Sequence, residues 1–226
     1  MKKLSIIIPA FNERATVEEI LWRVANASTP NYKKEIIVVD DGSNDGTEII
    51  LEKLKTLFPF ILLRHEKNIG KGAAIKTALK LVTGDAVLIQ DADLEYDPND
   101  YQKLLGVFGE ETRVVYGSRN LVKTKRGYLF YFLGGKFLTA FLNVISGSSL
   151  SDINTCYKLF SRDVIERIGV QSNGFEFCEE VTVKVLKLGY KIKEVPISYY
   201  PRKFSEGKKI RFMDGIIAIL TILKYK

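Results

Sequence analysis

"IIVVDDGSNDGTEII", residues 36–50, runs four β-branched apolar residues directly into Asp40 and Asp41. An uninterrupted apolar run of this kind is typical of a strand that is buried on both faces of a parallel sheet. From Thr47 onward the apolar residues recur at helical spacing as far as Leu57. A strand, a polar turn and a helix form the repeating unit of α/β proteins, and paired carboxylates at the end of such a strand indicate a ligand site.

Short apolar runs and helical stretches alternate in the same way through the first half of the chain. The apolar runs are residues 4–8, 35–39, 60–64, 85–90 and 113–117, and the helical stretches are 15–27, 47–57 and 72–82. This alternation predicts an α/β fold with a mostly parallel central sheet flanked by helices. Ligands bind beyond the carboxyl ends of such strands, where this chain carries Asn12, Glu13, Asp40, Asp41, Asn68, Asp91, Asp93 and Arg119.

Two aspartate pairs at strand ends are hard to explain by helix capping alone. Capping suits Asn12, Ser43 or Asn44, but a cap uses one carboxylate at a time. Asp91-Ala92-Asp93 follows the apolar run 85–90, and carboxylates one residue apart in a turn can both reach a hard divalent cation. An Asp-x-Asp alone is a weak signal. Its position opposite the Asp40 pair favours binding of a metal and a diphosphate over a structural role.

Composition narrows the classes of function. The 226 residues suit one large domain, and the net charge of +7 favours anionic partners such as phosphates, nucleic acid or an acidic membrane, with a solvated lysine-rich surface as the alternative. The two cysteines, Cys156 and Cys178, lack metal-site spacing and are expected to be reduced, packed thiols. His65 is the only histidine, which gives Ser-His-Asp hydrolysis little support.

The second half is more apolar. Residues 128–145 and 210–226 contain long apolar runs, but neither reaches the roughly 18 uninterrupted apolar residues of a membrane span. A membrane interface is favoured for both stretches, and burial against the sheet or a second protomer is the alternative. Residues 180–189 are expected to form an amphipathic helix and 190–203 an edge strand. The N-terminal apolar run is too short for a signal peptide and is expected to be the first strand.

Several segments resemble the donor-binding motifs of family 2 glycosyltransferases, in the same order and at similar spacing. They are IIIPAFNE (6–13), VVDDGSNDGT (38–47), NIGKGAA (68–74) and QDADLEYDP (90–98). Three later segments resemble the dolichyl- and polyprenyl-phosphate sugar synthases of that family: SDINTCYKLFSRDVI (151–165), GFEFCEE (174–180) and YYPRKFSEGKKI (199–210). The resemblance implies a GT-A-type nucleotide-sugar-binding fold over 1–226, with a nucleotide-sugar half (1–120) and an acceptor and membrane-interface half (121–226) that ends in amphipathic helices.

The resemblance also implies roles for residues on the donor side. Asp40 would contact the nucleotide base, with Asp41 beside it, and Lys71 would border the donor site, although its loop also reads as a plain helix start. Glu95 stands where relatives can use a glutamine as a further metal contact, so the number of metal ligands stays open. The base and ribose loop would be Pro9, Ala10, Asn12 and Glu13, and the motif that holds the diphosphate through Mg²⁺ or Mn²⁺ would be Asp91, Ala92 and Asp93.

On the acceptor side, arginines are the expected phosphate ligands because guanidinium binds phosphate through two hydrogen bonds. The candidates are Arg119, Arg126 and Arg202, whereas Lys203, Lys208 and Lys209 are expected to be solvated or to face an anionic membrane. A phosphate acceptor needs no general base, whereas a hydroxyl acceptor needs a carboxylate. Asp152, Glu179 and Glu180 are the candidate bases, and the catalytic set expected from the sequence is Asp93, Arg119, Arg202 and Glu179.

The function expected from these motifs is inverting transfer of a hexose to dolichyl or undecaprenyl phosphate. The donor would be GDP-mannose, UDP-glucose or UDP-GlcNAc. The alternative acceptor is a saccharide hydroxyl in a polysaccharide or glycolipid. A nucleic-acid-binding module has no support beyond charge, because the basic residues are scattered. Since the chain ends at Lys226 without an appended membrane helix, peripheral association with the cytoplasmic membrane face is expected, by the chain itself or through an anchoring partner.

Overall fold

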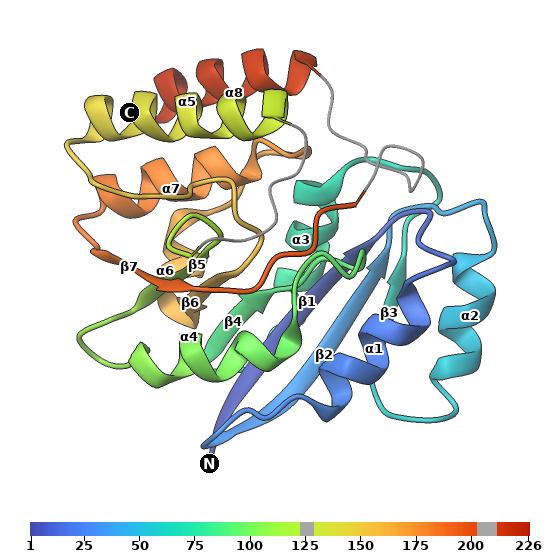
Figure 1. The fold of residues 1–226 in the computed structure, drawn as a ribbon. Helices are drawn as coiled ribbons and strands as arrows, with labels where there is room; N and C mark the ends of the chain where they lie inside the picture. Colours follow the sequence, from blue (N-terminus) through green and yellow to red (C-terminus); the bar gives the residue numbers. More distant parts are fainter. Residues whose placement is uncertain (123–128, 203–211) are drawn as a thin grey trace.

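A computed structural model describes residues 1–122, 129–202 and 212–226 (Figure 1). The strands are β1 (Lys2–Ala10), β2 (Tyr32–Asp40), β3 (Ile61–Arg64), β4 (Ala86–Ile89), β5 (Val114–Ser118), β6 (Lys158–Ser161) and β7 (Ile192–Pro196). The helices are α1 (Val17–Asn26), α2 (Thr47–Leu54), α3 (Lys71–Leu79), the short 3₁₀ helix η1 (Pro98–Asp100), α4 (Tyr101–Val107), α5 (Leu129–Ser146), α6 (Arg162–Ile168), α7 (Phe177–Lys187) and α8 (Phe212–Tyr225).

The seven strands form one sheet in the order β3-β2-β1-β4-β6-β5-β7. All neighbouring strands pair in parallel except β6, which runs antiparallel to both β4 and β5. The mostly parallel α/β sheet predicted from the sequence is therefore confirmed, and the five predicted strands are β1 to β5. The predicted edge strand is also confirmed, because β7 ends the sheet opposite β3.

The core explains why the central strands are apolar. Ile6, Ile7 and Ile8 of β1 are fully buried, because β2 and β4 flank this strand and helices pack on both sheet faces. Figure 1 shows α1 in front of the sheet and α3 behind it. The face predicted for α1 is the one that is buried: Val17, Ile20, Leu21 and Val24.

Strand β6 is the main element that the pattern of apolar runs does not predict. Its four residues begin with Lys158, and a charged residue at this position interrupts the apolar pattern by which a buried strand is recognised in the sequence. The ammonium group is buried, and it donates hydrogen bonds to the carbonyl oxygens of Ile153 and Thr155 at 2.7 and 2.8 Å. These bonds replace the water that a lysine normally keeps.

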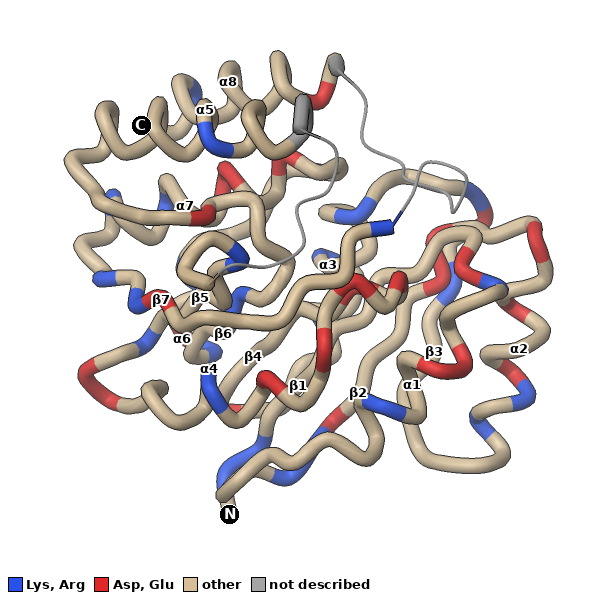
Figure 2. Tube along the Cα trace, in the orientation of Figure 1, with Lys and Arg blue, Asp and Glu red and all other residues tan. Residues whose placement is uncertain are grey.

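A second apolar cluster lies between α5, α7 and α8, apart from the sheet core. It is built from Leu138, Leu142, Leu150, Ile153, Val183, Ala218 and Ile222. Figure 1 shows α5 and α8 side by side above α7, and Figure 2 shows that they carry few charged positions. Helix α5 runs without a break through Gly134 and Gly135. Within the described ranges, no helix has the length and apolar character needed to cross a membrane.

Candidate active site

The carboxyl ends of the parallel strands bring the predicted polar residues to one edge of the sheet. Ala10 at the end of β1 pairs with Asp40 at the end of β2, which pairs with Arg64 at the end of β3. Strand β4 ends at Ile89, two residues before Asp91. Figure 2 shows acidic positions gathered in this region. The predicted grouping of strand-end residues is therefore present for β1 to β4.

Asp40 is a buried carboxylate that lies beside Arg64. Its side chain is 1% exposed, and Oδ1 accepts a hydrogen bond from the Ser43 backbone N–H at 3.0 Å. Oδ2 lies 3.4 Å from Arg64 Nε but accepts no hydrogen bond from the described residues. A buried acceptor without a hydrogen bond costs about 1–3 kcal/mol. A contact between Asp40 and a bound base stays a prediction.

Asp41 holds a neighbouring loop. Oδ1 lies 2.6 Å from His65 Nδ1 and accepts from the Ile69 N–H, and Oδ2 accepts from the Gly70 N–H at 2.8 Å. His65 in turn lies 2.9 Å from Thr77 Oγ1 on α3. The side chain thus shapes the entry to α3, and a direct contact with a nucleotide stays a prediction.

The loop after β1 is joined to the loop after β2. The Asn12 N–H donates to Ser43 Oγ at 2.9 Å, and Asn12 Oδ1 accepts from the Asn44 N–H at 3.0 Å. Asn12, Ser43 and Asn44 therefore do not cap helices. At the start of α2 the Thr47 N–H donates to Asp45, and the N-cap residue of α1 is Thr16. Pro9 and Ala10 form the last two residues of β1, directly before this joined loop.

The Asp91-Ala92-Asp93 turn carries two carboxylates that each face a basic side chain. Lys71 Nζ lies 2.5 Å from Asp91 Oδ1, and an Arg202 nitrogen lies 3.0 Å from Asp93 Oδ2. Ala92 is buried, and Leu94 adopts a left-handed backbone at φ 61° that turns the chain after Asp93. This conformation is unfavourable for a leucine and is found mainly where function requires it.

The electrostatics of the turn suit a divalent cation. Burial, together with the charges of Asp91 and Glu95, raises the pKa of Asp93 to about 7, although Arg202 opposes the shift. Among the described residues, no group of three His, Cys, Asp or Glu side chains is arranged to hold a metal. The Asp91 and Asp93 oxygens are hard donors, and Mg²⁺ commonly takes one or two carboxylates and completes its shell with phosphate and water. The two aspartates therefore fit a metal that a diphosphate also holds.

Glu95 and Glu13 both contact Arg202. Both oxygens of Glu95 are hydrogen-bonded, Oε1 to the Arg202 backbone N–H at 2.7 Å and Oε2 to the Tyr199 hydroxyl at 3.0 Å. The Arg202 guanidinium lies 3.0 Å from Glu13 Oε2. A metal contact by Glu95 stays a prediction. Lys203, Lys208 and Lys209 lie outside the described residues, as does Arg126.

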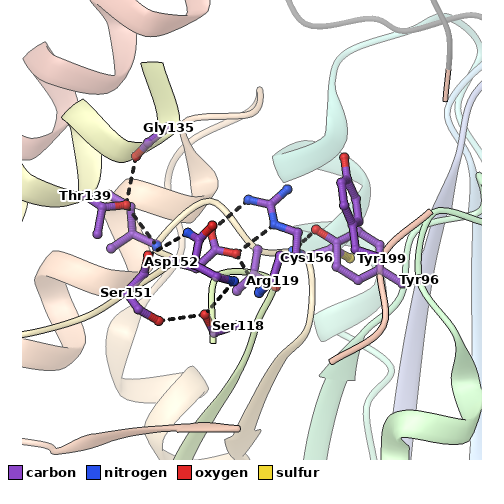
Figure 3. Close-up of polar contacts among 12 residues, drawn as sticks. Tyr96, Ser118, Arg119, Gly135, Thr139, Ser151, Asp152, Cys156 and Tyr199 are labelled. Atoms are coloured by element: carbon purple, nitrogen blue, oxygen red, sulfur yellow. Dashed lines mark hydrogen bonds and ion pairs between the residues drawn. The ribbon is translucent and has the colours of Figure 1, made fainter. Parts of the chain in front are cut away.

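Arg119 is held by Asp152 in a two-point ion pair (Figure 3). Both N–O distances are 2.7 Å, and the guanidinium carbon lies 5.1 Å from the centre of the Tyr199 ring. Burial opposes ionisation of Asp152, but Arg119 lowers its pKa below the ordinary value. Asp152 is therefore a partner of Arg119 and is poorly suited to act as a free base.

The two other candidate bases lie at the start of α7. Glu180 accepts the N–H groups of Gln171 and Ser172 and pairs with Lys184, and these bonds lower its pKa although burial opposes the shift. Glu179 is 2% exposed, accepts a hydrogen bond from Asn154 Nδ2, and has a pKa raised to about 7 by burial. Glu180 thus anchors a loop, whereas Glu179 is buried beside Asn154.

Sequence reasoning missed the residues that hold the predicted ones. Tyr199 contacts both Glu95 and Arg119, His65 orients Asp41, and Glu194 accepts the N–H groups of Ser151 and Asp152. The only sequence signals were the single histidine and the Tyr-Tyr-Pro run at 199–201. The prediction for the cysteines is confirmed, since Cys156 and Cys178 are buried free thiols.

Solved structures share the fold. The glucosyl-3-phosphoglycerate synthase of Mycobacterium tuberculosis in complex with Mg²⁺ and UDP is similar with a TM-score of 0.76 and 22% identity, over 99% of this chain and 79% of that one. Its complex with phosphoglyceric acid gives a TM-score of 0.76 over 99% and 80% of the two chains. At this identity the likeness shows a GT-A-type fold.

Curated relatives are closer in sequence. The chain is 30% identical to the low-salt glycan biosynthesis hexosyltransferase Agl6 of Haloferax volcanii and 29% identical to the dolichol-phosphate mannosyltransferase of Pyrococcus furiosus. It covers 51% and 59% of these two proteins, with 94% and 91% of its own length matched. It is 32% identical to the dolichyl-phosphate beta-glucosyltransferase ALG5A of Trichomonas vaginalis, over 97% of this chain and 71% of that protein. Residues 5–169 match the family model of glycosyl transferase family 2, and the chain therefore belongs to that family.

Proposed function

We propose that this chain is an inverting glycosyltransferase that moves a hexose from a nucleotide sugar to a polyprenyl phosphate. The names of two relatives, a dolichol-phosphate mannosyltransferase and a dolichyl-phosphate beta-glucosyltransferase, support this acceptor class. We further propose that residues 1–120 bind the donor and residues 121–226 serve the acceptor and the membrane interface.

On the donor side, Asp40 accepts an N–H of the base through Oδ2, and the loop from Pro9 to Glu13 lies against the ribose. Asp91 and Asp93 would hold Mg²⁺ or Mn²⁺ beside the diphosphate. When bound, the metal stabilises the negative charge that grows on the leaving nucleoside diphosphate. Lys71, whose Nζ lies 2.5 Å from Asp91 Oδ1, adds a positive charge beside the diphosphate.

One observation carries the choice of acceptor: the three candidate bases are ion-paired or buried, whereas Arg119 and Arg202, although each is paired with a carboxylate, keep 23% and 15% of their side chains exposed. Asp152 is paired with Arg119, Glu180 with Lys184, and Glu179 is buried. Both arginines are partly accessible. Arg202 is ion-paired with Asp93, and Arg119 contacts Tyr199, which is hydrogen-bonded to Glu95. A phosphate acceptor fits this arrangement, because it brings its own negative oxygen and needs no base.

The proposed reaction is a single displacement. An oxygen of the lipid phosphate attacks the anomeric carbon, and the bond from that carbon to the diphosphate oxygen breaks with its electron pair. No proton has to be removed, and the anomeric configuration inverts. Arg119 and Arg202 orient the attacking phosphate and offset its repulsion from the diphosphate.

The apolar outer faces of α5 and α8 fit a membrane interface. Phe137, Val144 and Leu220 point away from the cluster that these helices share with α7, and all three are exposed. A lipid phosphate lies at the membrane surface, so we propose peripheral association with the cytoplasmic face, by the chain itself or through an anchoring partner.

Transfer to a hydroxyl group is the second candidate. Glu179 has a pKa near 7, which is the range in which a general base is most effective. A neighbour with the same fold was solved with phosphoglyceric acid, which is not a lipid. This candidate requires Glu179 to become accessible when the acceptor binds.

A donor and acceptor panel tests the proposal. Purified protein with Mn²⁺ or Mg²⁺ is incubated with GDP- and UDP-sugars, and release of nucleoside diphosphate is measured with and without a short polyprenyl phosphate in detergent. Release that depends on the lipid from one donor supports the proposal. Release stimulated by free saccharides and not by the lipid would overturn the acceptor assignment and direct attention to Glu179.

A further inference from the structure

Glu95 binds the segment 199–202 through three groups. Its side-chain oxygens accept the Tyr199 hydroxyl at 3.0 Å and the Arg202 N–H at 2.7 Å, and its carbonyl oxygen accepts the Tyr200 N–H at 2.9 Å. The Glu95 N–H donates to Asp93 Oδ1 at 3.1 Å. The segment is therefore fixed to the Asp93 turn across more than a hundred residues of chain.

The same segment places both candidate phosphate ligands. The Tyr199 ring lies 5.1 Å from the Arg119 guanidinium carbon, at a distance typical of a cation–π contact. Figure 3 shows Tyr199 next to Tyr96, on the side of Arg119 away from Asp152. Arg202, whose N–H is held by Glu95, extends its guanidinium to Glu13 and Asp93, 3.0 Å from each. Arg119 is thus connected to Glu95 through Tyr199, and Arg202 is connected to it through its own backbone N–H.

We infer that Glu95 and Tyr199 are positioning residues, a brace that sets the separation of Arg119 and Arg202 for an acceptor phosphate. This inference rests on the proposed function. In this arrangement each side-chain oxygen of Glu95 accepts one hydrogen bond from the segment 199–202, and through that segment the carboxylate acts on the two arginines.

Four variants separate the brace from a metal ligand. Tyr199→Phe keeps the ring on Arg119 and removes only the hydroxyl, Glu95→Ala removes both side-chain bonds, and Glu95→Gln keeps groups that can make them. Tyr199→Phe and Glu95→Ala are each expected to raise the acceptor KM about ten-fold, as one lost hydrogen bond to a charged group can do. The acceptor KM of the double variant Glu95→Ala/Tyr199→Phe should be no higher than that of the single variant with the higher acceptor KM. Glu95→Gln should stay within about three-fold of wild type.

Measurements of metal and donor binding distinguish the brace from a role of Glu95 as a metal ligand. Half-saturation by Mn²⁺ for nucleoside diphosphate binding, measured without acceptor, should change by less than about two-fold in every variant. The donor KM should be equally insensitive. An increase of about ten-fold in the Mn²⁺ requirement for Glu95→Ala, with Tyr199→Phe equal to wild type, would make Glu95 a metal ligand and overturn the brace.

A double-mutant cycle measured by thermal unfolding tests the brace without relying on turnover. If the Glu95–Tyr199 bond exists, the losses in Tm of the two single variants will not add in the double variant. Tyr200→Phe is the matched control, because its side chain is 54% exposed, and its loss should add to that of Glu95→Ala. Absence of turnover with every donor would reject the proposed function alone. Additive Tm losses for Glu95→Ala and Tyr199→Phe would reject the brace even in an active enzyme.

Discussion

Asp93 is the residue at which the proposed donor, metal and acceptor groups would meet. Its carboxylate lies 3.0 Å from Arg202, and the neighbouring charges of Asp91 and Glu95 add to the effect of burial on its pKa. Asp93→Asn keeps the shape and removes the charge. We expect the variant to fold, to lose turnover by about a hundred-fold or more, and to need much more Mn²⁺ for nucleoside diphosphate binding, because one of two hard ligands is gone.

Asp163→Asn is the matched control for Asp93→Asn. Asp163 pairs with Arg113 at the start of α6, away from the strand ends that form the site. Its substitution should leave turnover unchanged, because surface ion pairs contribute little. Initial rates and Mn²⁺ titrations of both variants provide the comparison. Near-wild-type turnover of Asp93→Asn would remove the metal from the proposed site.

Glu179 is expected to make the stability of the protein depend on pH. Burial raises its pKa from 4.5 to about 7, so the fold favours the neutral carboxyl. This contribution is complete below pH 4.5 and is lost as the pH rises through about 7. Glu179→Gln removes the charge and can still accept the Asn154 N–H. It should therefore stabilise the protein more at pH 8 than at pH 5, by at most about 3 kcal/mol.

Urea unfolding of wild type and Glu179→Gln at the two pH values measures this difference. The same variant separates the two acceptor classes, because a phosphate acceptor needs no base and turnover should survive. A stability difference that does not depend on pH would show that Glu179 is ionised in the fold. Loss of turnover by about a hundred-fold would favour the hydroxyl acceptor.

At this scale the sequence predicts the residues that carry charge but not what each one contacts. Asp40, Asp91 and Asp93 are recognisable because their motifs are local and follow apolar strands. The contacts of Glu95 with Tyr199 and of Asp93 with Arg202 join positions 104 and 109 residues apart. Such pairs depend on how β4 and the segment after β7 approach each other, which no local pattern encodes.

At the scale of elements, the sequence predicts those whose burial is uniform. Strand β4 and the stretches 6–8 of β1, 36–39 of β2 and 114–116 of β5 are continuously apolar and buried, because both faces of the sheet are covered there. Strand β6 is concealed by the buried Lys158, and α4 and α6, with seven residues each, are too short for helical periodicity to identify them. The antiparallel strand in the sheet was therefore not predictable from apolar runs.

Helix α3 depends on close packing at its first residues. A Cβ on Gly72 would lie 2.5 Å from the Ser172 carbonyl oxygen, and the Gly72 N–H donates to the Gly174 carbonyl oxygen at 3.2 Å. Gly72→Ala must therefore push the loop before α7 away from Lys71 and the proposed donor site. We expect a loss of about 1–3 kcal/mol in the free energy of unfolding and weaker nucleoside diphosphate binding.

Gly106→Ala in α4 is the control for this packing, because a Cβ there meets nothing within 4 Å. It should stabilise the protein by about 0.5–1 kcal/mol through helix propensity. Denaturant titrations of the two variants, with nucleotide binding measured in parallel, give the comparison. If Gly72→Ala is as stable as wild type, the loop at 172–174 is not held against α3 in solution.

At the scale of the whole molecule, charge and apolar surface are separated. The chain carries a net charge of +7, while α5 and α8 present few charged positions (Figure 2). These helices are joined to the sheet through α7 and the apolar cluster that the three share. Their outer faces therefore form an apolar surface at the end of the molecule opposite α2 (Figure 1), and basic residues elsewhere can strengthen its attraction to anionic lipid.

Vesicle binding tests whether this surface meets a membrane. Leu220 on α8 and Ile49 on α2 are 60% and 70% exposed, so an aspartate at either position should leave the fold intact. In sedimentation with phosphatidylcholine–phosphatidylglycerol vesicles, Leu220→Asp is expected to weaken binding about ten-fold, because an apolar contact is replaced by a charge that anionic lipid repels. Ile49→Asp adds the same charge away from α5 and α8 and should cause a much smaller change. Equal losses in both variants would assign the attraction to net charge alone. A wild-type protein that does not sediment with vesicles but dissociates from a dimer to a monomer on Leu220→Asp would assign the surface to a second copy of the chain.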